Sequence, residues 1–213
     1  IEDLSTEITE DELKEAFIDE RGVKYSKDVR KLLKVPQELR RGYSVKEGTR
    51  IICNNAFAGC SLSNIAIPDS VTDIGNGAFS RCSSLSNIVI PKSVICLNGN
   101  PFSDWEGMLE CLSPNFIYED DVLFNKDKSE IVSFRNQKIE SYIIPDSVTS
   151  IGDDAFCGCS SLSNIVIPDS VTSIGEGAFM NCSSLSNIVI PDSVTSIGDW
   201  AFSCCRSLFS IVI

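Results

Sequence analysis

The chain has 213 residues and a formal net charge of −12, with 30 acidic residues against 18 basic ones. This acidic balance argues against nucleic acid as a partner, because phosphates favour Lys and Arg. The sequence contains no histidine, which removes Ser-His and Cys-His nucleophiles and the commonest general base. No apolar run approaches the roughly 20 residues of a membrane helix. We therefore expect neither an enzyme, nor a nucleic-acid-binding protein, nor insertion into a membrane.

The N-terminal segment predicts a short helix. Thr9-x-x-Glu12 is a capping box, and Leu13, Ala16 and Phe17 follow on one helical face. We expect residues 1–16 to form an N-terminal capping helix over the first coil. The chain begins with Ile1 and not with Met, which favours removal of an upstream piece and leaves export open.

Two segments predict β-hairpins. We expect strands near 22–25 and 31–35 to pair, and likewise 121–124 and 131–134, with the polar loop 125–128 reversing the second hairpin. The two segments align without a gap at an offset of 99 residues, and the same offset carries Phe57 onto Phe156. The alignment indicates a tandem duplication, 17–113 and 116–213, each half a hairpin module followed by three coils. We expect 17–213 to be a single solenoid.

The coils repeat every 23 residues, as the recurrence of Ile-Pro-Asp-Ser-Val at 144, 167 and 190 shows. Leu162-x-x-Ile165-x-Ile167 alternates with period two and predicts a short strand, the following Pro-Asp-Ser predicts a turn, and Val171-x-x-Ile174 predicts a second inward segment. We expect Gly175 to adopt a positive φ. A unit this short must bury its apolar side chains against its neighbours. One Phe marks each coil: Phe57, Phe79, Phe102, Phe156, Phe179 and Phe202.

The repeat text IPDSVTSIGxxAFxxCSSLSNIV resembles the consensus of the BspA-like (treponemal-type) leucine-rich repeat family, over roughly 43–113 and 142–213. The resemblance implies a mainly β fold, a right-handed leucine-rich-repeat solenoid, here with β-hairpin insertions and the short N-terminal helix. It also implies a bacterial, adhesin-like protein that is secreted or on the cell surface and contacts host or neighbouring-cell components.

Two side-chain ladders offer chemistry, and a structural role is favoured for both. Five cysteines share one repeat slot, where Cys behaves as a small buried hydrophobe, and no Cys-x-x-Cys is present. The Asp ladder could relieve its repulsion with a divalent cation, but one carboxylate per coil is too few for calcium, and turn formation is favoured. We expect no cofactor, no metal and no catalytic residue. The cysteines are Cys60, Cys82, Cys159, Cys182 and Cys205, and the aspartates are Asp69, Asp146, Asp169 and Asp192.

The outward positions of each strand are the candidate partner-binding residues. Stacked coils place an amide row beside an apolar row, which is typical of a binding surface, although strand propensity alone also favours Val there. These residues are Asn64, Asn87, Val89, Asn164, Val166, Asn187 and Val189. The repeat positions that vary between coils, such as the two residues before each Ala-Phe, are interpreted as unconstrained residues on an outer ridge. Trp200 occupies one of these positions and is a candidate contact there. Alternatively, Trp200 packs under a terminal cap.

The predicted function is therefore a non-enzymatic interaction module that contacts an unidentified protein or a surface glycan through the stacked strands. A structural spacer or self-assembling rod without a dedicated ligand is the alternative. The bare strand at 211–213 is a template for pairing with another chain, so self-association through this edge is also expected.

Overall fold

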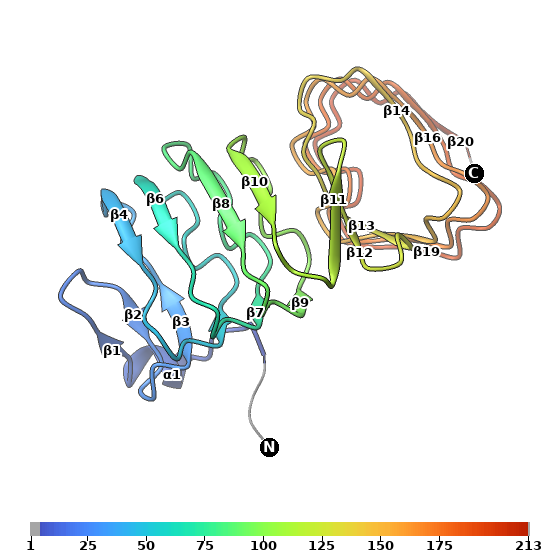
Figure 1. Cartoon of the computed structure of the whole chain (residues 1–213). Coiled ribbons are helices and arrows are strands. Elements are labelled where there is room, and N and C mark those ends of the chain that lie inside the picture. The colour runs from blue at the N-terminus through green and yellow to red at the C-terminus, as the bar shows by residue number, and fades with distance from the viewer. Residues whose placement is uncertain (1–4, 213) are drawn as a thin grey trace. The chain divides into compact units, whose positions relative to one another are not determined.

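The computed structural model describes residues 5–212, which form a mainly β solenoid with one short helix. The chain divides into two compact units, unit 1 (1–115) and unit 2 (116–213), and each is described by itself (Figure 1). The division falls where the sequence predicts the duplication. A single solenoid running through both halves stays a prediction.

Within residues 5–115, unit 1 contains the helix and ten strands. Its first sheet has the order β1-β2-β3-β5-β7-β9, and its other strands pair as β4 with β6 and β8 with β10. The bounds are α1 Glu10–Lys14, β1 Phe17–Ile18, β2 Lys24–Tyr25, β3 Lys31–Lys34, β4 Arg41–Ser44, β5 Ile51–Ile52, β6 Leu62–Ala66, β7 Asp73–Ile74, β8 Asn87–Ile90, β9 Cys96–Leu97 and β10 Met108–Cys111.

Unit 2 repeats this arrangement, without a helix in the described part, 116–212. Its first sheet has the order β11-β12-β13-β15-β17-β19, and β14 pairs with β16 and β18 with β20. The bounds are β11 Phe116–Glu119, β12 Val122–Asn125, β13 Glu130–Phe134, β14 Ser141–Ile143, β15 Ser150–Ile151, β16 Asn164–Val166, β17 Ser173–Ile174, β18 Asn187–Val189, β19 Ser196–Ile197 and β20 Ser210–Val212.

The predicted hairpins are confirmed: β2 pairs with β3, and β12 with β13, antiparallel. Each is extended by a strand that the sequence analysis did not predict, β1 and β11. The last hairpin strand then pairs parallel with the first coil, β3 with β5 and β13 with β15. The insertion in unit 2 therefore stacks as part of the solenoid.

The core consists of apolar ladders, as the repeat predicts. In unit 2, Ile165 and Ile188 point inward and are buried. The phenylalanines stack along the solenoid, with ring centroids 5.0 Å apart for Phe156 and Phe179 and 5.5 Å apart for Phe179 and Phe202. The packing is continuous from coil to coil because every coil supplies the same side chain at the same place.

The N-terminal helix is shorter than predicted and packs differently. The capping box is confirmed: Glu12 N–H donates to Thr9 Oγ1 at 3.2 Å, and Thr9 N–H donates to the Glu12 carboxylate at 2.9 Å. The helix, however, spans only Glu10–Lys14, and residues 1–4 of the predicted capping segment lie outside the described range. Leu13 and Phe17 are exposed, whereas Ile8 and Ala16 pack against a small cluster of the first sheet made of Leu33, Ile51 and Cys53.

The prediction of a positive φ at Gly175 is wrong. Its φ is ordinary, and the glycine is required by a close approach: a Cβ there would lie 2.4 Å from Asp153 Oδ1 and 2.6 Å from Asp153 N. Positive φ occurs two residues later, at Gly177, and at the equivalent residues of other coils, including Asn55 and Asp154.

Candidate functional site

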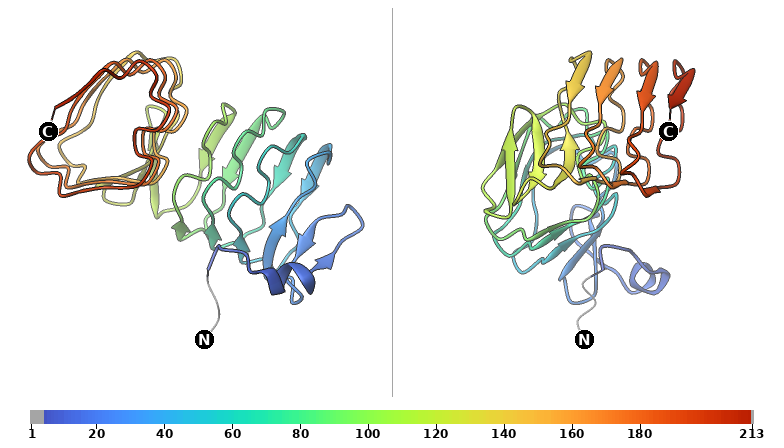
Figure 2. Two further views of the ribbon diagram at one scale, coloured as in Figure 1. Left: turned by 180° about the vertical axis from the view of Figure 1, so that it is seen from behind. Right: turned by 90° about the vertical axis from the view of Figure 1, so that its right-hand side faces the viewer.

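In unit 2 the strands β14, β16, β18 and β20 stack side by side (Figure 2, right), and their register aligns the outward residues in two rows. Adjacent coils are tied by backbone bonds, such as Ser186 N–H to the Ser163 carbonyl at 3.3 Å, so outward residues of successive coils align. The polar row is Ser141, Asn164, Asn187 and Ser210, and the apolar row is Ile143, Val166, Val189 and Val212.

The apolar row is open to solvent: Ile143, Val166, Val189 and Val212 are 69%, 46%, 61% and 54% exposed. Asn164 and Asn187 are exposed beside it, and the intervening Ile165 and Ile188 are buried in the core. Period-two alternation produces both outcomes, because each inward Ile forces its two neighbours outward. The eight residues form a surface without formal charge, which we call the unit 2 face.

The corresponding surface of unit 1 lacks the continuous apolar row. Strand register aligns Ser44 with Ala66, and Val89 with Glu110. Val89 is half-buried, and a serine and a carboxylate occupy the ends of its row. Asn64 and Asn87 are exposed as in unit 2, but Met108 stands next to Asn87 in the polar row. The repeat predicts equivalent coils, whereas the structure distinguishes the two units.

Trp200 is 69% exposed and has φ +60°, so it projects from the outer ridge. No segment of residues 5–212 covers Trp200, and its packing under a terminal cap stays a prediction. Its backbone conformation is one that non-glycine residues avoid, and Gly77 and Gly177 occupy the same slot in other coils. A bulky aromatic at such a position indicates a feature retained despite its conformational cost.

The two variable residues before Ala-Phe in each coil are not all unconstrained surface. In three coils the first of them joins two coils: Asn54 Oδ1 accepts from Asn76 N–H at 2.9 Å, Asn76 Oδ1 accepts from Asn100 N–H at 3.0 Å, and Asp153 Oδ1 accepts from Glu176 N–H at 2.8 Å. The second residue adopts positive φ, as Asn55 does. These two requirements explain the abundance of Asn, Asp and Gly there. The recurrence of those residue types was the signal in the sequence.

The cysteine ladder is part of the core. Cys60, Cys82, Cys159 and Cys182 are buried, and Cys205 is half-buried. The Cys182 thiol donates to the Phe156 carbonyl at 3.1 Å, and the Cys205 thiol makes the same bond one coil later. Burial raises the pKa of Cys182 and Cys205 above the ordinary thiol value. Burial thus keeps the Cys182 and Cys205 thiols protonated and weakly nucleophilic, whereas a hydrogen bond with Cys82 lowers the pKa of Cys60 to about 7.

The turn aspartates are exposed, while the serine that follows each one bridges coils. Ser170 Oγ donates to the Val148 carbonyl at 2.7 Å, and Ser193 Oγ donates to the Val171 carbonyl at the same distance. Within residues 5–212, no cluster of three or more His, Cys, Asp or Glu side chains is placed to hold a metal ion. Across the same range, no helix has the length and apolar character needed to span a membrane.

The strand edge at the end of the chain is described as far as Val212, and Ile213 lies outside the described residues. Strand β20 pairs parallel with β18 along its full length. Self-association through this edge stays a prediction.

Comparison with known proteins gives a family and several structural neighbours. The model of the BspA type leucine rich repeat region matches six copies, over residues 43–122 and 130–213. No curated protein matches the sequence.

A leucine-rich repeat protein from Eubacterium ventriosum is 28% identical with a TM-score of 0.67, over 80% of this chain and 53% of its own. A leucine rich cell surface protein from Faecalibacterium prausnitzii is 26% identical with a TM-score of 0.61, over 83% of this chain and 60% of its own. The pneumococcal vaccine antigen PcpA, 23% identical with a TM-score of 0.64, covers 81% of this chain and 50% of its own, and it shares the fold. The chain thus spans between half and three fifths of these proteins. With the family model matching most of its length, the chain belongs to the BspA-type leucine-rich repeat family.

Proposed function

We propose that this protein is a non-enzymatic cell-surface interaction module that contacts a protein partner through the unit 2 face. The observation that carries the proposal is the exposed apolar row, four β-branched side chains in register on adjacent strands. Single exposed hydrophobic residues are ordinary on protein surfaces, but a contiguous exposed apolar patch marks an interaction site.

The electrostatics of unit 2 support this choice of surface. From residue 142 to 213 there are seven acidic residues and one basic residue, Arg206. None of these charges belongs to the eight residues of the unit 2 face. Depletion of charge at the centre of a patch is the compositional feature of protein–protein interfaces. The acidic surroundings would also steer a partner that carries basic residues around an apolar contact.

The difference between the units supports a specific role over simple strand stability. If β-propensity alone placed Val in the outward slots, the strands of unit 1 would carry the same row. Unit 1 instead has Ser44, Ala66 and Glu110 there. Trp200, exposed in the same unit, is a candidate second contact on the outer ridge.

A surface location is part of the proposal. One structural neighbour, 26% identical, is described as a leucine rich cell surface protein. Since this chain spans only 60% of that protein, the location and the partner of the whole are proposed by analogy of family and fold.

The test compares two arginine substitutions at the same strand slot. Val166→Arg introduces a charge into the apolar row, and Ala66→Arg makes the same change at the equivalent exposed position of unit 1. Binding of fluorescently labelled protein to intact bacterial and epithelial cells would be measured by flow cytometry, with circular dichroism to verify folding.

We expect Val166→Arg to weaken binding at least about tenfold, and Ala66→Arg to leave it unchanged. Equal binding by both variants, or equal loss, would refute the role of the unit 2 face. Absence of any saturable binding by the unsubstituted protein would favour the structural spacer. Loss of binding after removal of cell-surface glycans, with no loss after protease treatment, would reassign the partner to a glycan.

A further inference from the structure

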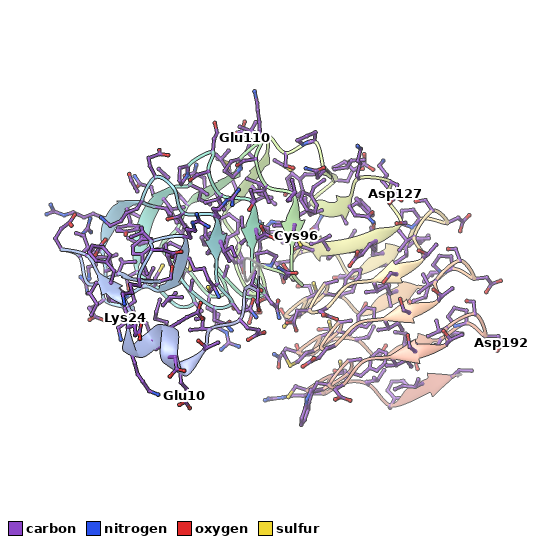
Figure 3. The ribbon with its side chains drawn as sticks, turned by 90° about the horizontal axis from the view of Figure 1, so that it is seen from below. Glu10, Lys24, Cys96, Glu110, Asp127 and Asp192 are labelled. Carbon is purple, nitrogen blue, oxygen red and sulfur yellow. The ribbon has the colours of Figure 1, made fainter. Side chains whose placement is uncertain are left out.

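Two cysteines of unit 1 lie in contact between neighbouring coils, and the proposed function does not use them. The Sγ atoms of Cys60 and Cys82 are 3.5 Å apart and share a hydrogen bond. Both side chains are buried, with 2% and 0% of their surface exposed. The other cysteines of unit 1 are Cys53, Cys96 and Cys111, of which Cys96, in strand β9, is labelled in Figure 3. Cys60 and Cys82 are both free thiols, so a covalent bond can form between them.

The backbone fixes the separation of the two coils next to these cysteines. Phe57 N–H donates to the Ala78 carbonyl at 2.8 Å, and two residues later Gly59 N–H makes the same bond to the Ser80 carbonyl. Backbones that are paired in this way lie about 4.8 Å apart, and a disulfide needs Cα atoms about 4.4–6.8 Å apart. The sulfur atoms have to approach by about 1.5 Å to reach the bonded distance of about 2.05 Å. Rotation of the two side chains can supply this movement while the backbone bonds stay in place.

Oxidation of the pair leaves no orphaned acceptor in the turn. Cys82 Sγ also donates to the Phe57 carbonyl, at 3.0 Å. The same carbonyl accepts from Cys60 N–H at 3.0 Å, so it keeps one hydrogen bond when Cys82 loses its proton. A buried polar group without a partner is costly, and the Cys60 amide avoids that cost here.

Cys60 is the more nucleophilic thiol of the pair. A hydrogen bond with Cys82 lowers the pKa of Cys60 to about 7; burial opposes this effect, and a hydrogen bond from the Leu62 backbone adds to it. The same contact, together with burial, raises the pKa of Cys82. The thiolate is the form of cysteine that attacks an oxidant. We therefore expect Cys60 to react first and Cys82 to supply the second sulfur.

A missing residue distinguishes the coil that contains Cys60. Cys60 is followed by one serine and then Leu62, whereas Cys82 is followed by two serines before Leu85. The shorter link places the buried Leu62 two residues after Cys60, where its amide contributes to the hydrogen bonding of the sulfur. In unit 2, Cys182 keeps both serines, and burial raises its pKa. The repeat position alone therefore does not make a ladder cysteine reactive.

We propose that Cys60 and Cys82 form a reversible disulfide when the folded protein meets a peroxide. The peroxide has to be small, because Cys60 is almost fully buried. The Cys60 sulfur attacks one oxygen of hydrogen peroxide, the O–O bond breaks, and Cys60 becomes a sulfenic acid. The second oxygen leaves as hydroxide and takes up the proton that Cys60 had released.

The second step joins the two coils. The Cys82 sulfur attacks the Cys60 sulfur, the S–S bond forms and the S–O bond breaks. The hydroxyl group leaves with the Cys82 proton as water. Two thiols are thus oxidised to one disulfide, and one peroxide is reduced to two molecules of water. This modification does not involve the unit 2 face.

The test treats the folded full chain with hydrogen peroxide and locates the products by peptide mass spectrometry. After removal of the peroxide, free thiols are blocked with iodoacetamide in urea. The exposed Cys204 sets the dose, which is the treatment that oxidises it completely. We expect the cross-linked Cys60–Cys82 peptides, lighter by two hydrogens, to become the main form of both cysteines. Dithiothreitol should restore both thiols, because a disulfide is reducible whereas sulfinic and sulfonic acids are not.

The matched variants are Cys82→Ala and Cys182→Ala, which make the same change at the same repeat position of the two units. Circular dichroism would verify that both fold. We expect Cys82→Ala to abolish the cross-link and Cys182→Ala to leave it unchanged. The proposal is overturned if the folded unsubstituted chain forms no Cys60–Cys82 cross-link at this dose, or forms it only when treated in urea. It is also overturned if Cys182→Ala abolishes the cross-link as Cys82→Ala does.

Discussion

The stacked phenylalanines make a quantitative prediction about what holds the coils together. Phe179 is fully buried, between Phe156 at 5.0 Å and Phe202 at 5.5 Å, with interplanar angles of 17° and 3°. Phe179→Ala removes the ring from the core and leaves a cavity between two coils. Burial and cavity terms for such a change amount to about 3–5 kcal/mol. We expect a loss of about 4 kcal/mol in the free energy of unfolding of unit 2.

Phe179→Leu separates stacking from burial, because leucine keeps most of the apolar volume and loses both ring contacts. Each aromatic pair contributes about 0.5–1.5 kcal/mol beyond its area, so a loss of about 1–3 kcal/mol is expected. Phe209→Ala is the control. Phe209 is in the same unit and 78% exposed, and its truncation should change the free energy of unfolding by no more than about 0.5 kcal/mol.

The assay is urea denaturation of the full chain, followed by circular dichroism and by tryptophan fluorescence. The slope of free energy against urea reports the surface exposed, so a reduced slope in Phe179→Ala would mean that coils unfold separately. The reasoning would be refuted if Phe179→Ala cost less than about 1 kcal/mol at unchanged slope, or no more than Phe209→Ala.

Three further predictions concern single positions. Gly175→Ala should cost about 1–3 kcal/mol in urea denaturation, because its Cβ would meet Asp153 at 2.4 Å, and an unchanged midpoint would contradict the close approach. Trp200→Phe should remove the fluorescence that acrylamide quenches readily and leave the protected emission of buried Trp105; loss of the protected component instead would contradict the exposure of Trp200. Burial raises the pKa of Glu130, and the nearby carboxylates of Asp153 and Asp127 raise it further. The contribution of Glu130 to folding stability is therefore fully present below the pKa that it has in the unfolded chain, and it is lost as pH rises through its pKa in the folded protein. Glu130→Gln should abolish this loss in pH-dependent thermal unfolding, and an unchanged pH profile would refute it.

The sequence predicts the repeating parts of this fold well, because the same residue pattern recurs in several coils. The 23-residue period, the inward Ile165 and Ile188, and the phenylalanine stack all follow from patterns that recur in every coil. The hairpins and the capping box at Thr9 rest on local chemistry and are also confirmed. Strands β1 and β11 were not predicted, because β1 has two exposed residues and β11 has no buried residue, so neither has an alternating pattern.

The close-range features could not be predicted from one coil alone. The role of Gly175 depends on the Asp153 side chain of the preceding coil, 22 residues earlier. The packing of the N-terminal segment through Ile8 and Ala16 on the first sheet of unit 1 depends on a contact between distant parts of the chain, and nothing in the period places the segment there. The unit 2 face could be predicted as a pair of rows, but its restriction to one unit required knowing that Ser44 and Glu110 occupy the same row positions in unit 1.

Divergence between the two halves is the most informative property of the chain. Residues that both halves share, such as Phe57 and Phe156, build the common coil and are explained by packing. Functional surfaces are expected where the copies differ although the backbone is the same. Those differences include the outward apolar row, which runs through four strands of unit 2 and is interrupted by Ser44 and Glu110 in unit 1. The difference between the halves therefore supplies a test of the proposed unit 2 face: binding should weaken when the row receives the residues that unit 1 carries at the same positions.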